Sequence, residues 1–328
     1  MPHSSTLPLA FAEDNSFRSR LARSLKDLAA RGVLMGGSSW KYPGWMGQIY
    51  SESRYITRGK VSKKKFEAEC LAEYAEVFPA VGGDFSFYTF PSPEQWEKLF
   101  HAAPALQFGL KTPEMVTVRK WPGHARYGAR GGTANEQFLD ASLMTAAFLE
   151  PLAPYLAQVG VVMLEFGTFP KSEYPEPKAF FEDLDHFLSA LPPAFRYAVE
   201  IRNPEYLVPD YFACLKANRV AHVFNAWSRM PTLREQMAEE AAYTADFVVS
   251  RALLRRGRQY EQAVKSFEPY TRVQDPNPEA RQALAQLGRR AELEKRIAYI
   301  FVNNRLEGNA PETMMAVADL LLHGSDAT

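Results

Sequence analysis

The stretch Tyr197-Ala198-Val199-Glu200-Ile201-Arg202-Asn203-Pro204 has the pattern of a β-strand that ends at a proline. Its residues favour an extended chain, and proline closes it because proline lacks a backbone N–H donor and fixes φ. Side chains alternate between the two faces of a strand, so Glu200 and Arg202 share one face, about 7 Å apart. Burying either charge without a partner costs several kcal/mol, so this pair indicates either a structural ion pair or a functional site.

The rest of the chain alternates between short apolar strands and helical segments. Eight strands are predicted, at residues 33–38, 81–88, 106–111, 160–166, 197–202, 219–225, 246–250 and 297–304. The continuous apolar run at 160–166 is typical of a parallel strand covered on both faces. Eight strands alternating with helices over about 290 residues predict an α/β fold, a closed TIM-type (β/α)₈ barrel. An open doubly wound sheet is the alternative, but it usually has a G-x-G-x-x-G turn, which is absent here.

Helical periodicity predicts the elements between the strands. These lie at residues 66–78, 93–101, 135–152, 177–191, 211–218 and 311–322, with a charged helical insertion at about 260–294, before the last strand. We expect residues 33–328 to form a single barrel domain and residues 1–32 to form an N-terminal extension. The extension is predicted to be helical because apolar residues recur in it at helical spacing, at Phe17, Leu21, Leu25 and Leu28.

Two kinds of leader sequence were considered for this extension. The apolar segment 7–12 is too short for a signal peptide. A transit peptide would lack the acidic residues Glu13, Asp14 and Asp27. A helix that closes one end of the domain is therefore the favoured interpretation.

Composition limits the classes of partner. The chain has 328 residues, 46% of them hydrophobic, with 38 basic and 38 acidic residues and a formal net charge of zero. This balance argues against a protein that coats nucleic acid or an anionic membrane non-specifically. No apolar run approaches the roughly 20 residues of a membrane span, so no membrane partner is expected. Cys70 and Cys214 lie in helical patterns and indicate packed, reduced thiols, typical of a cytoplasmic protein.

Polar and aromatic residues recur at the carboxyl ends of the predicted strands. They are Ser38, Ser39, Trp40, Ser86, Tyr88, Lys111, Glu165, Glu200, Arg202, Asn225, Arg251, Asn303 and Asn304. In a parallel barrel these ends meet at one mouth, where such barrels carry their chemistry. Packing alone does not explain polar residues at one end of nearly every strand, so the pattern predicts a binding site there.

Three cations at separate strand ends suggest an anion site. Lys111, Arg202 and Arg251 can together hold a phosphate or a carboxylate. Backbone N–H groups around Ser38, which follows two glycines, can bind an oxyanion, although an ordinary turn is an equal alternative.

Further candidates for ligand contact come from aromatic and amide side chains. Trp40, Tyr42 and Trp45 can stack on a planar or sugar-like ligand, or pack the loop that carries them. The other candidate contacts are Tyr88, Asn303 and Asn304, of which the two asparagines can instead cap the strand.

Glu165 and Glu200 end neighbouring predicted strands and are the candidate catalytic residues. If their carboxylates lie close together, the pKa of one is raised and the two can act as a general acid–base couple. Ion pairing with Arg202 and Arg251 is the alternative. Magnesium or manganese on oxygen ligands stays possible, but no metal site is predicted, because the six histidines are dispersed along the chain. No Walker, H-E-x-x-H or G-x-S-x-G motif is present, so the cofactor is unknown.

A basic run supports a second class of function. Arg255, Arg256 and Arg258 follow Arg251 and precede Tyr260, which fits a loop that contacts nucleic-acid phosphates. A solvated helix face explains the same residues.

The segment Gly37-Ser38-Ser39-Trp40-Lys41-Tyr42-Pro43-Gly44-Trp45 resembles the opening motif of the YecE-like family, also called domain of unknown function 72. Further segments resemble the family in the same order, over roughly 33–322: they are 86–91, 111–113, 198–204, 244–248 with Arg251, and 301–304 with Gly308 and Ala310. The resemblance implies a TIM barrel, similar in shape to endonuclease IV and xylose isomerase, but no established reaction.

The chain departs from the family pattern at several positions. Gly82 stands where the family usually has Glu, Asp84 where it has Asn, Glu165 where Gln is usual, Asn203 where His is common, and Leu253-Leu254 where His-Gly tends to occur. If those family residues carry the chemistry, this member has altered or lost it. The expectation is therefore a barrel, enzyme or former enzyme, that binds a small anionic ligand such as a phosphorylated sugar or nucleotide. The alternatives are a nucleic-acid-binding barrel and an inactive scaffold.

Overall fold

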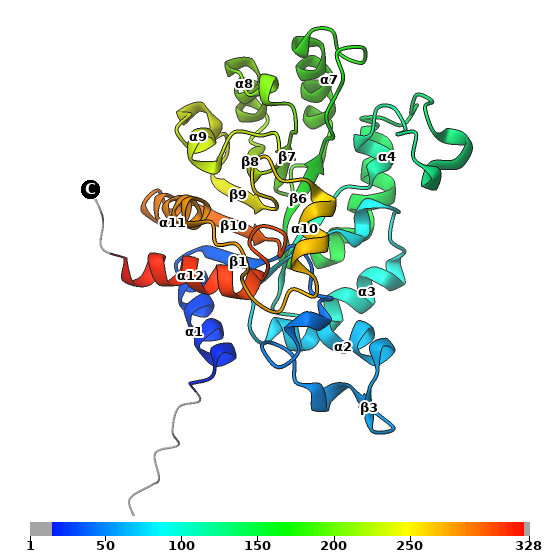
Figure 1. The fold of residues 1–328 in the computed structure, drawn as a ribbon. Helices are drawn as coiled ribbons and strands as arrows, with labels where there is room; N and C mark the ends of the chain where they lie inside the picture. Colours follow the sequence, from blue (N-terminus) through cyan, green and yellow to red (C-terminus); the bar gives the residue numbers. More distant parts are fainter. Residues whose placement is uncertain (1–14, 325–328) are drawn as a thin grey trace, which may run out of the picture.

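The computed structural model describes residues 15–324 and shows a closed barrel of eight parallel strands, in the order β1-β10-β9-β8-β7-β6-β5-β4 (Figure 1). The barrel strands are β1 (Val33–Gly37), β4 (Ala80–Gly83), β5 (Gln107–Lys111), β6 (Val159–Glu165), β7 (Tyr197–Glu200), β8 (Ala221–Ala226), β9 (Phe247–Ala252) and β10 (Ile297–Val302). The predicted TIM-type barrel is confirmed. The apolar segment 7–12 and the acidic residues Glu13 and Asp14 lie outside the described residues.

Helices surround the barrel, most of them on its outer side (Figure 1). They are α1 (Phe17–Ala30), α2 (Lys63–Ala75), α3 (Pro93–Ala102), α4 (Glu114–Thr117), α5 (Ala141–Met144), α6 (Glu150–Leu152), α7 (Pro177–Ser189), α8 (Pro209–Ala217), α9 (Leu233–Met237), α10 (Tyr260–Phe267), α11 (Pro278–Leu293) and α12 (Ala310–His323). A separate hairpin is formed by β2 (Ile56–Thr57) and β3 (Lys60–Val61). In residues 15–324, no helix is both long and apolar enough to span a bilayer.

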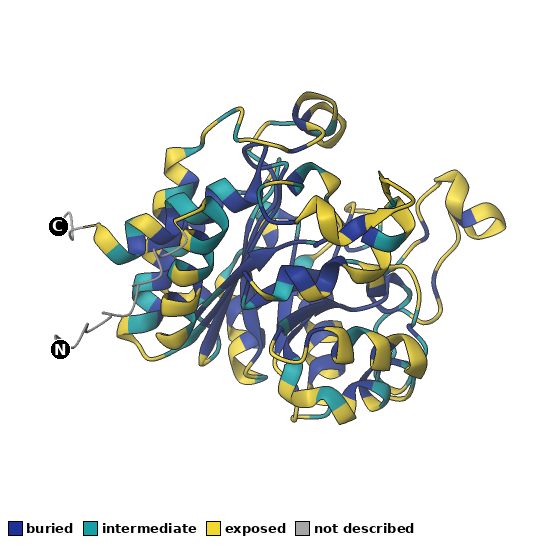
Figure 2. Cartoon of the chain, turned by 90° about the horizontal axis from the view of Figure 1, so that it is seen from below, coloured by how far each residue is buried: buried dark blue, intermediate teal, exposed yellow. Residues whose placement is uncertain are grey.

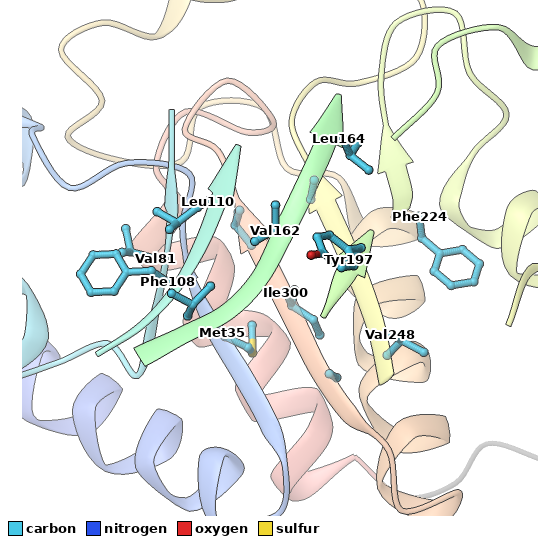
Figure 3. Close-up of a cluster of buried hydrophobic side chains, with 14 of the residues drawn as sticks. Met35, Val81, Phe108, Leu110, Val162, Leu164, Tyr197, Phe224, Val248 and Ile300 are labelled. Carbon is cyan, nitrogen blue, oxygen red and sulfur yellow. The ribbon is translucent and has the colours of Figure 1, made fainter. Parts of the chain in front are cut away.

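The core has two layers because strand side chains alternate in direction. Outward-facing residues such as Leu110, Val162 and Ile300 pack between the barrel and the helices (Figure 3). Inward-facing residues, among them Met163 and Phe301, fill the barrel itself. Figure 2 shows the same organisation, with buried strands inside and exposed residues on the outer faces of the helices.

Two glycines make room for aromatic rings inside the barrel. A Cβ at Gly109 would lie 2.4 Å from Cζ of Phe301, and one at Gly160 would lie 2.6 Å from the ring of Tyr299. Because Gly109 and Lys111 point to the same face of β5, the ring of Phe301 lies below Lys111 in the barrel interior.

The N-terminal helix predicted from the apolar spacing is present as α1. Ser16 caps it by accepting a hydrogen bond from the Ser19 amide, and Leu21, Leu25 and Leu28 are buried. The helix packs against α12 and β1, so it closes that side of the barrel.

Two predicted elements have ends that lie far from those in the structure. The strand expected at 81–88 ends at Gly83, and a 3₁₀ turn (Phe85–Phe87) follows because the Ser86 hydroxyl donates to the Lys111 carbonyl at 2.6 Å. The helix expected at 135–152 begins at Ala141, where Asp140 accepts from the Leu143 amide. It then passes through a π turn (Thr145–Leu149) before Pro151, which has no N–H to donate.

The predicted helical insertion at 260–294 is two helices. Helix α11 packs on β9, β10 and β1, so it is the ordinary barrel helix between β9 and β10. Helix α10 packs instead with residues that follow β1, β8 and β9, namely Tyr42, Trp227, Leu253 and Leu254. The insertion is therefore confined to α10 and its flanking loops, which cover part of the carboxyl-terminal mouth.

We expect the substitution Gly109→Ala to lower the free energy of unfolding by about 1–3 kcal/mol, because the added methyl group collides with Phe301 inside a filled barrel. Urea denaturation measures the change. Gly123→Ala is the matched control, since nothing lies within 4 Å of a Cβ there, and its effect should stay within about 0.5 kcal/mol. Equal effects of the two substitutions would contradict the packing described for the barrel interior.

Candidate functional site

Six charged side chains meet at the carboxyl-terminal mouth of the barrel. They are Asp84, Lys111, Glu165, Glu200, Arg202 and Arg251. Each lies at or just after the end of a barrel strand, on β4, β5, β6, β7 or β9. Glu165 and Glu200 are direct neighbours in the register of β6 and β7. The parallel strands therefore bring together every charged residue that the sequence singled out at their ends.

The carboxylate of Glu165 lies at the centre of this charged cluster. It is contacted by Lys111 Nζ at 2.7 Å, Arg202 Nη2 at 2.9 Å and Arg251 Nη1 at 2.5 Å. Three cations from three different strand ends thus converge on one buried carboxylate.

Glu200 is fully buried and is held by two guanidinium groups. Its Oε1 accepts from Nε and Nη2 of Arg202 at 3.3 and 3.2 Å, and its Oε2 accepts from Nη1 of Arg251. The same nitrogen of Arg251 also donates to Glu165. One guanidinium therefore bridges the two carboxylates.

This arrangement sets the protonation of Glu165. Burial acts to raise the pKa of this carboxyl, but Arg202, Lys111 and Arg251 together hold its pKa well below the ordinary value of 4.5. The expectation that two close carboxylates raise the pKa is wrong for Glu165, because cations lie between it and Glu200. Burial acts to lower the pKa of Arg251, but the carboxylates of Glu200 and Glu165 have the larger combined effect. The pKa of Arg251 is therefore raised above its ordinary value. The geometry is that of ion pairs between the two glutamates and the two arginines, which the sequence analysis gave as the alternative to an acid–base couple.

Asp84 differs from the other two carboxylates because it is only loosely held. Its Oδ1 lies 3.2 Å from Lys111 Nζ and 3.6 Å from Arg251 Nη2, and its side chain is 39% exposed. It also lines a cavity of about 450 Å³, whose other walls come from Ser39 and Trp40, from Phe85, and from residues of α2 and α3; the other five members of the cluster do not line it. Asp84 is therefore the link between the charged cluster and an open cavity.

The aromatic candidates divide into two groups. Trp40 borders the cavity, with its ring 6.0 Å from that of Phe85 in an edge-on arrangement. Trp45 is fully buried, and Tyr42 packs on it at 4.8 Å and on Tyr270 at 5.8 Å. Tyr42 and Trp45 thus form the packing of their loop, which was the alternative interpretation for them.

Tyr88 does not end a strand, because β4 stops before the 3₁₀ turn. Tyr88 is 58% exposed, and its ring lies 5.0 Å from the guanidinium of Arg126. It is a residue of the outer rim, apart from the charged cluster.

Three predicted contacts have structural hydrogen bonds. The Ser38 amide donates to the Val302 carbonyl, so it is not available to an oxyanion. Asn303 Oδ1 accepts from the Arg305 amide at 3.0 Å. Asn304 Oδ1 accepts from the Ala310 amide and from Trp45 Nε1, at 2.8 and 3.2 Å. The two asparagines therefore hold the loop after β10. The predicted oxyanion site at Ser38-Ser39 loses the Ser38 amide, and its Ser39 part stays a prediction.

Several residues of the mouth were missed because they lie in loops. Trp227 stacks on Arg202, with 4.0 Å between the guanidinium and the ring, and Phe87 lies 4.6 Å from Lys111 Nζ. Arg305 lies 4.4 Å from the ring of Tyr260 and has no carboxylate partner in the described part of the chain. Only the position of Arg305, two residues after Asn303, offered a signal in the sequence.

Among residues 15–324, no group of three or more His, Cys, Asp or Glu side chains is arranged to hold a metal ion. His222 lies against Tyr211 and Phe224, and burial lowers its pKa to about 4.

Comparison with known proteins settles the family. The model of the family described as "Protein of unknown function DUF72" matches residues 34–327. The chain belongs to this family. The resemblance predicted from the sequence motifs is therefore confirmed.

Individual relatives in the DUF72 family are distant. "UPF0759 protein YecE" of Escherichia coli K12 is 23% identical over 178 residues, which cover 53% of this chain and 50% of that protein. The chain thus spans about half the length of the curated relatives it matches. A DUF72 structure from Enterococcus faecalis V583 has a TM-score of 0.58 at 18% identity and covers 90% of this chain and 97% of that one. One from Thermotoga maritima MSB8 has a TM-score of 0.58 at 19% identity, covering 88% and 98%. These two structures share the fold.

The substitution Glu165→Gln tests the role of the central carboxylate. It removes the shared partner of Lys111 and Arg251, which are buried, and of Arg202, which is half-buried, so we expect a loss of about 3–5 kcal/mol in the free energy of unfolding at neutral pH. Because the folded pKa lies below 4.5, the carboxylate stabilises the fold above that pH, and this contribution is lost as the pH falls through the folded pKa. The difference between wild type and variant should therefore shrink in acid.

Urea denaturation across this pH range measures both quantities, since urea does not screen ion pairs as guanidinium chloride does. Glu182→Gln is the control, because Glu182 is 69% exposed and lies 3.8 Å from Lys178, and it should change stability by less than about 0.5 kcal/mol. A Glu165→Gln variant as stable as wild type at neutral pH would contradict the role given to this cluster.

Proposed function

We propose that the carboxyl-terminal mouth of the barrel binds a small anionic ligand, whose charged group takes the place of Asp84. The observation that carries the proposal is the position of Asp84. It contacts Lys111 and Arg251 through one oxygen, and it also lines the cavity beside the cluster. A carboxylate or phosphate oxygen in the cavity would reach the same cations once Asp84 turns to solvent.

The charge balance supports this exchange. Lys111, Arg202 and Arg251 match Asp84, Glu165 and Glu200, so the cluster is neutral as it stands. When Asp84 leaves, one positive charge is uncompensated, and a buried charge without a partner is costly. The ligand anion would supply the missing partner.

The cavity indicates the size and character of the remaining part of the ligand. A volume of about 450 Å³ falls in the range of ordinary small-molecule pockets. Trp40 and Phe85 offer aromatic surface. Apart from Asp84, the charged residues of the wall are Lys41, Lys98 and Glu67, so one positive charge is in excess there. A phosphorylated sugar or a nucleotide-like molecule has the matching combination of anionic group and flat or ring-shaped body.

The proposal is one of binding and assigns no proton transfer to the two glutamates. Both oxygens of Glu200 are held by Arg202 and Arg251, and Glu165 is kept ionised by its three cations. Their role is to fix the cations in position.

The basic run 255–258 does not favour a nucleic-acid partner. Arg255 and Arg258 both contact Asp275, the former at 2.8 Å, and Arg256 lies 3.1 Å from Glu235. Each of these arginines already has a carboxylate partner.

The substitution Asp84→Asn should strengthen ligand binding. It removes the competing charge and leaves the three cations in place, so we expect the Kd for inorganic phosphate to fall about tenfold, since a charged hydrogen bond contributes about 1.5–3 kcal/mol. Lys111→Met should weaken binding by a similar factor. Isothermal titration calorimetry with inorganic phosphate, extended to sugar phosphates and nucleotides, measures both effects.

Asp246→Asn is the matched control. Asp246 is exposed and immediately precedes β9, at the opposite end of the barrel, so this variant should bind phosphate as the wild type does. If none of these anions binds wild type or Asp84→Asn, or if Asp246→Asn improves binding equally, the proposal fails.

A further inference from the structure

A strongly basic segment projects from the outside of the barrel. Between residues 54 and 65 lie six basic residues and no acidic one: Arg54, Arg58, Lys60, Lys63, Lys64 and Lys65. The whole chain has no net charge, so the rest of it carries the compensating negative charge. The zero net charge of the chain is therefore a sum over its whole length, and residues 54–65 carry a local positive charge. We call residues 54–65 the basic hairpin.

The basic hairpin is a paired two-stranded ribbon with a short turn. Strands β2 and β3 pair antiparallel, with Ile56 opposite Val61 and Thr57 opposite Lys60. Arg58 and Gly59 form the turn, both with positive φ, at 53° and 78°. Positive φ at both central residues is typical of the tight turns that match the twist of a hairpin. Figure 1 shows the hairpin, labelled β3, extending away from the body of the molecule.

The base of the basic hairpin is anchored to α2. The Tyr55 hydroxyl donates to Glu73 at 2.6 Å, and the Ser51 hydroxyl donates to the same carboxylate at 2.8 Å. Tyr55 itself is buried. These two hydrogen bonds tie the base of the hairpin to α2, and the tip carries Ile56 and Val61 on one face and Thr57 and Lys60 on the other.

The tip combines positive charge with apolar surface. Ile56 is 47% exposed and Val61 is 48% exposed, and directly opposed residues lie on the same face of a hairpin. Arg54 is paired with Glu76, and Lys63 lies 3.7 Å from Glu67. In the described residues, Arg58, Lys60 and Lys64 have no carboxylate at ion-pairing distance.

We propose that the basic hairpin docks the protein on an anionic lipid surface. Ile56 and Val61 would enter the boundary between headgroups and acyl chains. Arg58 at the turn, and Lys60 on the opposite face of the thin two-stranded ribbon, would then lie within a Debye length of the lipid phosphates. The proposal is independent of the ligand site in the barrel.

The side chains at the tip favour lipid over nucleic acid. Both partners offer phosphates, but single-stranded nucleic acids are usually held by aromatic rings on which bases stack. The basic hairpin has one aromatic residue, Tyr55, and it is buried against α2. An exposed pair of aliphatic side chains instead suits the boundary between the lipid headgroups and the acyl chains.

Cosedimentation of the full chain with lipid vesicles tests the proposal. We expect binding to vesicles of phosphatidylcholine mixed with phosphatidylglycerol, little binding to phosphatidylcholine alone, and weaker binding as salt is raised. Lys60→Glu should lower the partition coefficient by about tenfold or more, since each basic residue near an anionic surface contributes roughly fivefold. Lys178→Glu is the matched control, because Lys178 is 75% exposed on α7, and it should bind as wild type does.

A second variant separates the two kinds of partner. Ile56→Ser with Val61→Ser leaves the charge unchanged and should still lower vesicle binding several-fold. Its folding is checked by thermal unfolding, and both residues are exposed enough for the fold to tolerate serine. The proposal is overturned if wild type does not bind the anionic vesicles, or if Lys178→Glu weakens binding as much as Lys60→Glu. It is also overturned if the chain prefers a mixed-sequence oligonucleotide to vesicles and the serine variant binds both as wild type does.

Discussion

The contact of three cations with the buried carboxylate of Glu165 is the interaction on which the mouth of the barrel depends. Lys111, Arg202 and Arg251 come from strand ends far apart in the sequence, and all three lie within 3 Å of this one group. None of the buried charges would be tolerated alone, since an unpaired buried ion costs several kcal/mol. The cluster therefore requires β5, β6, β7 and β9 to end at the same level.

The barrel below the cluster makes that arrangement possible. Phe301 and Tyr299 fill the interior where Gly109 and Gly160 leave space, so the charged layer rests on a packed apolar floor. Above it, the cluster is open to solvent chiefly through Asp84 and Arg202, the two members with the most exposed side chains. A site that is rigid below and exchangeable at one carboxylate is suited to taking up an anion without rearranging the strands.

The fold and the charged residues of the mouth could be predicted from the sequence for one physical reason. Strand periodicity fixes which side chains point into the barrel and which residues end each strand, and parallel strands bring those ends together. That reasoning found Lys111, Glu165, Glu200, Arg202 and Arg251.

It was less successful wherever the chain leaves a strand, because tertiary contacts then decide the direction of each side chain. Tyr42 packs against α10, Asn304 accepts a hydrogen bond from the Ala310 amide, and Tyr88 is carried outward by a turn that Ser86 ties to β5. The direction in which the pKa of Glu165 shifts also could not be predicted from the sequence, because it depends on the distances to three cations. Asp84 and Trp227 were missed as site residues for the same reason, since both lie in loops.

A crystal structure of the protein grown or soaked in inorganic phosphate tests the central claim most directly. The account predicts phosphate within hydrogen-bonding distance of Lys111 Nζ, with the Asp84 side chain turned away and Glu165 still held by Lys111, Arg202 and Arg251. Phosphate bound only elsewhere, with Asp84 still on Lys111, would contradict it.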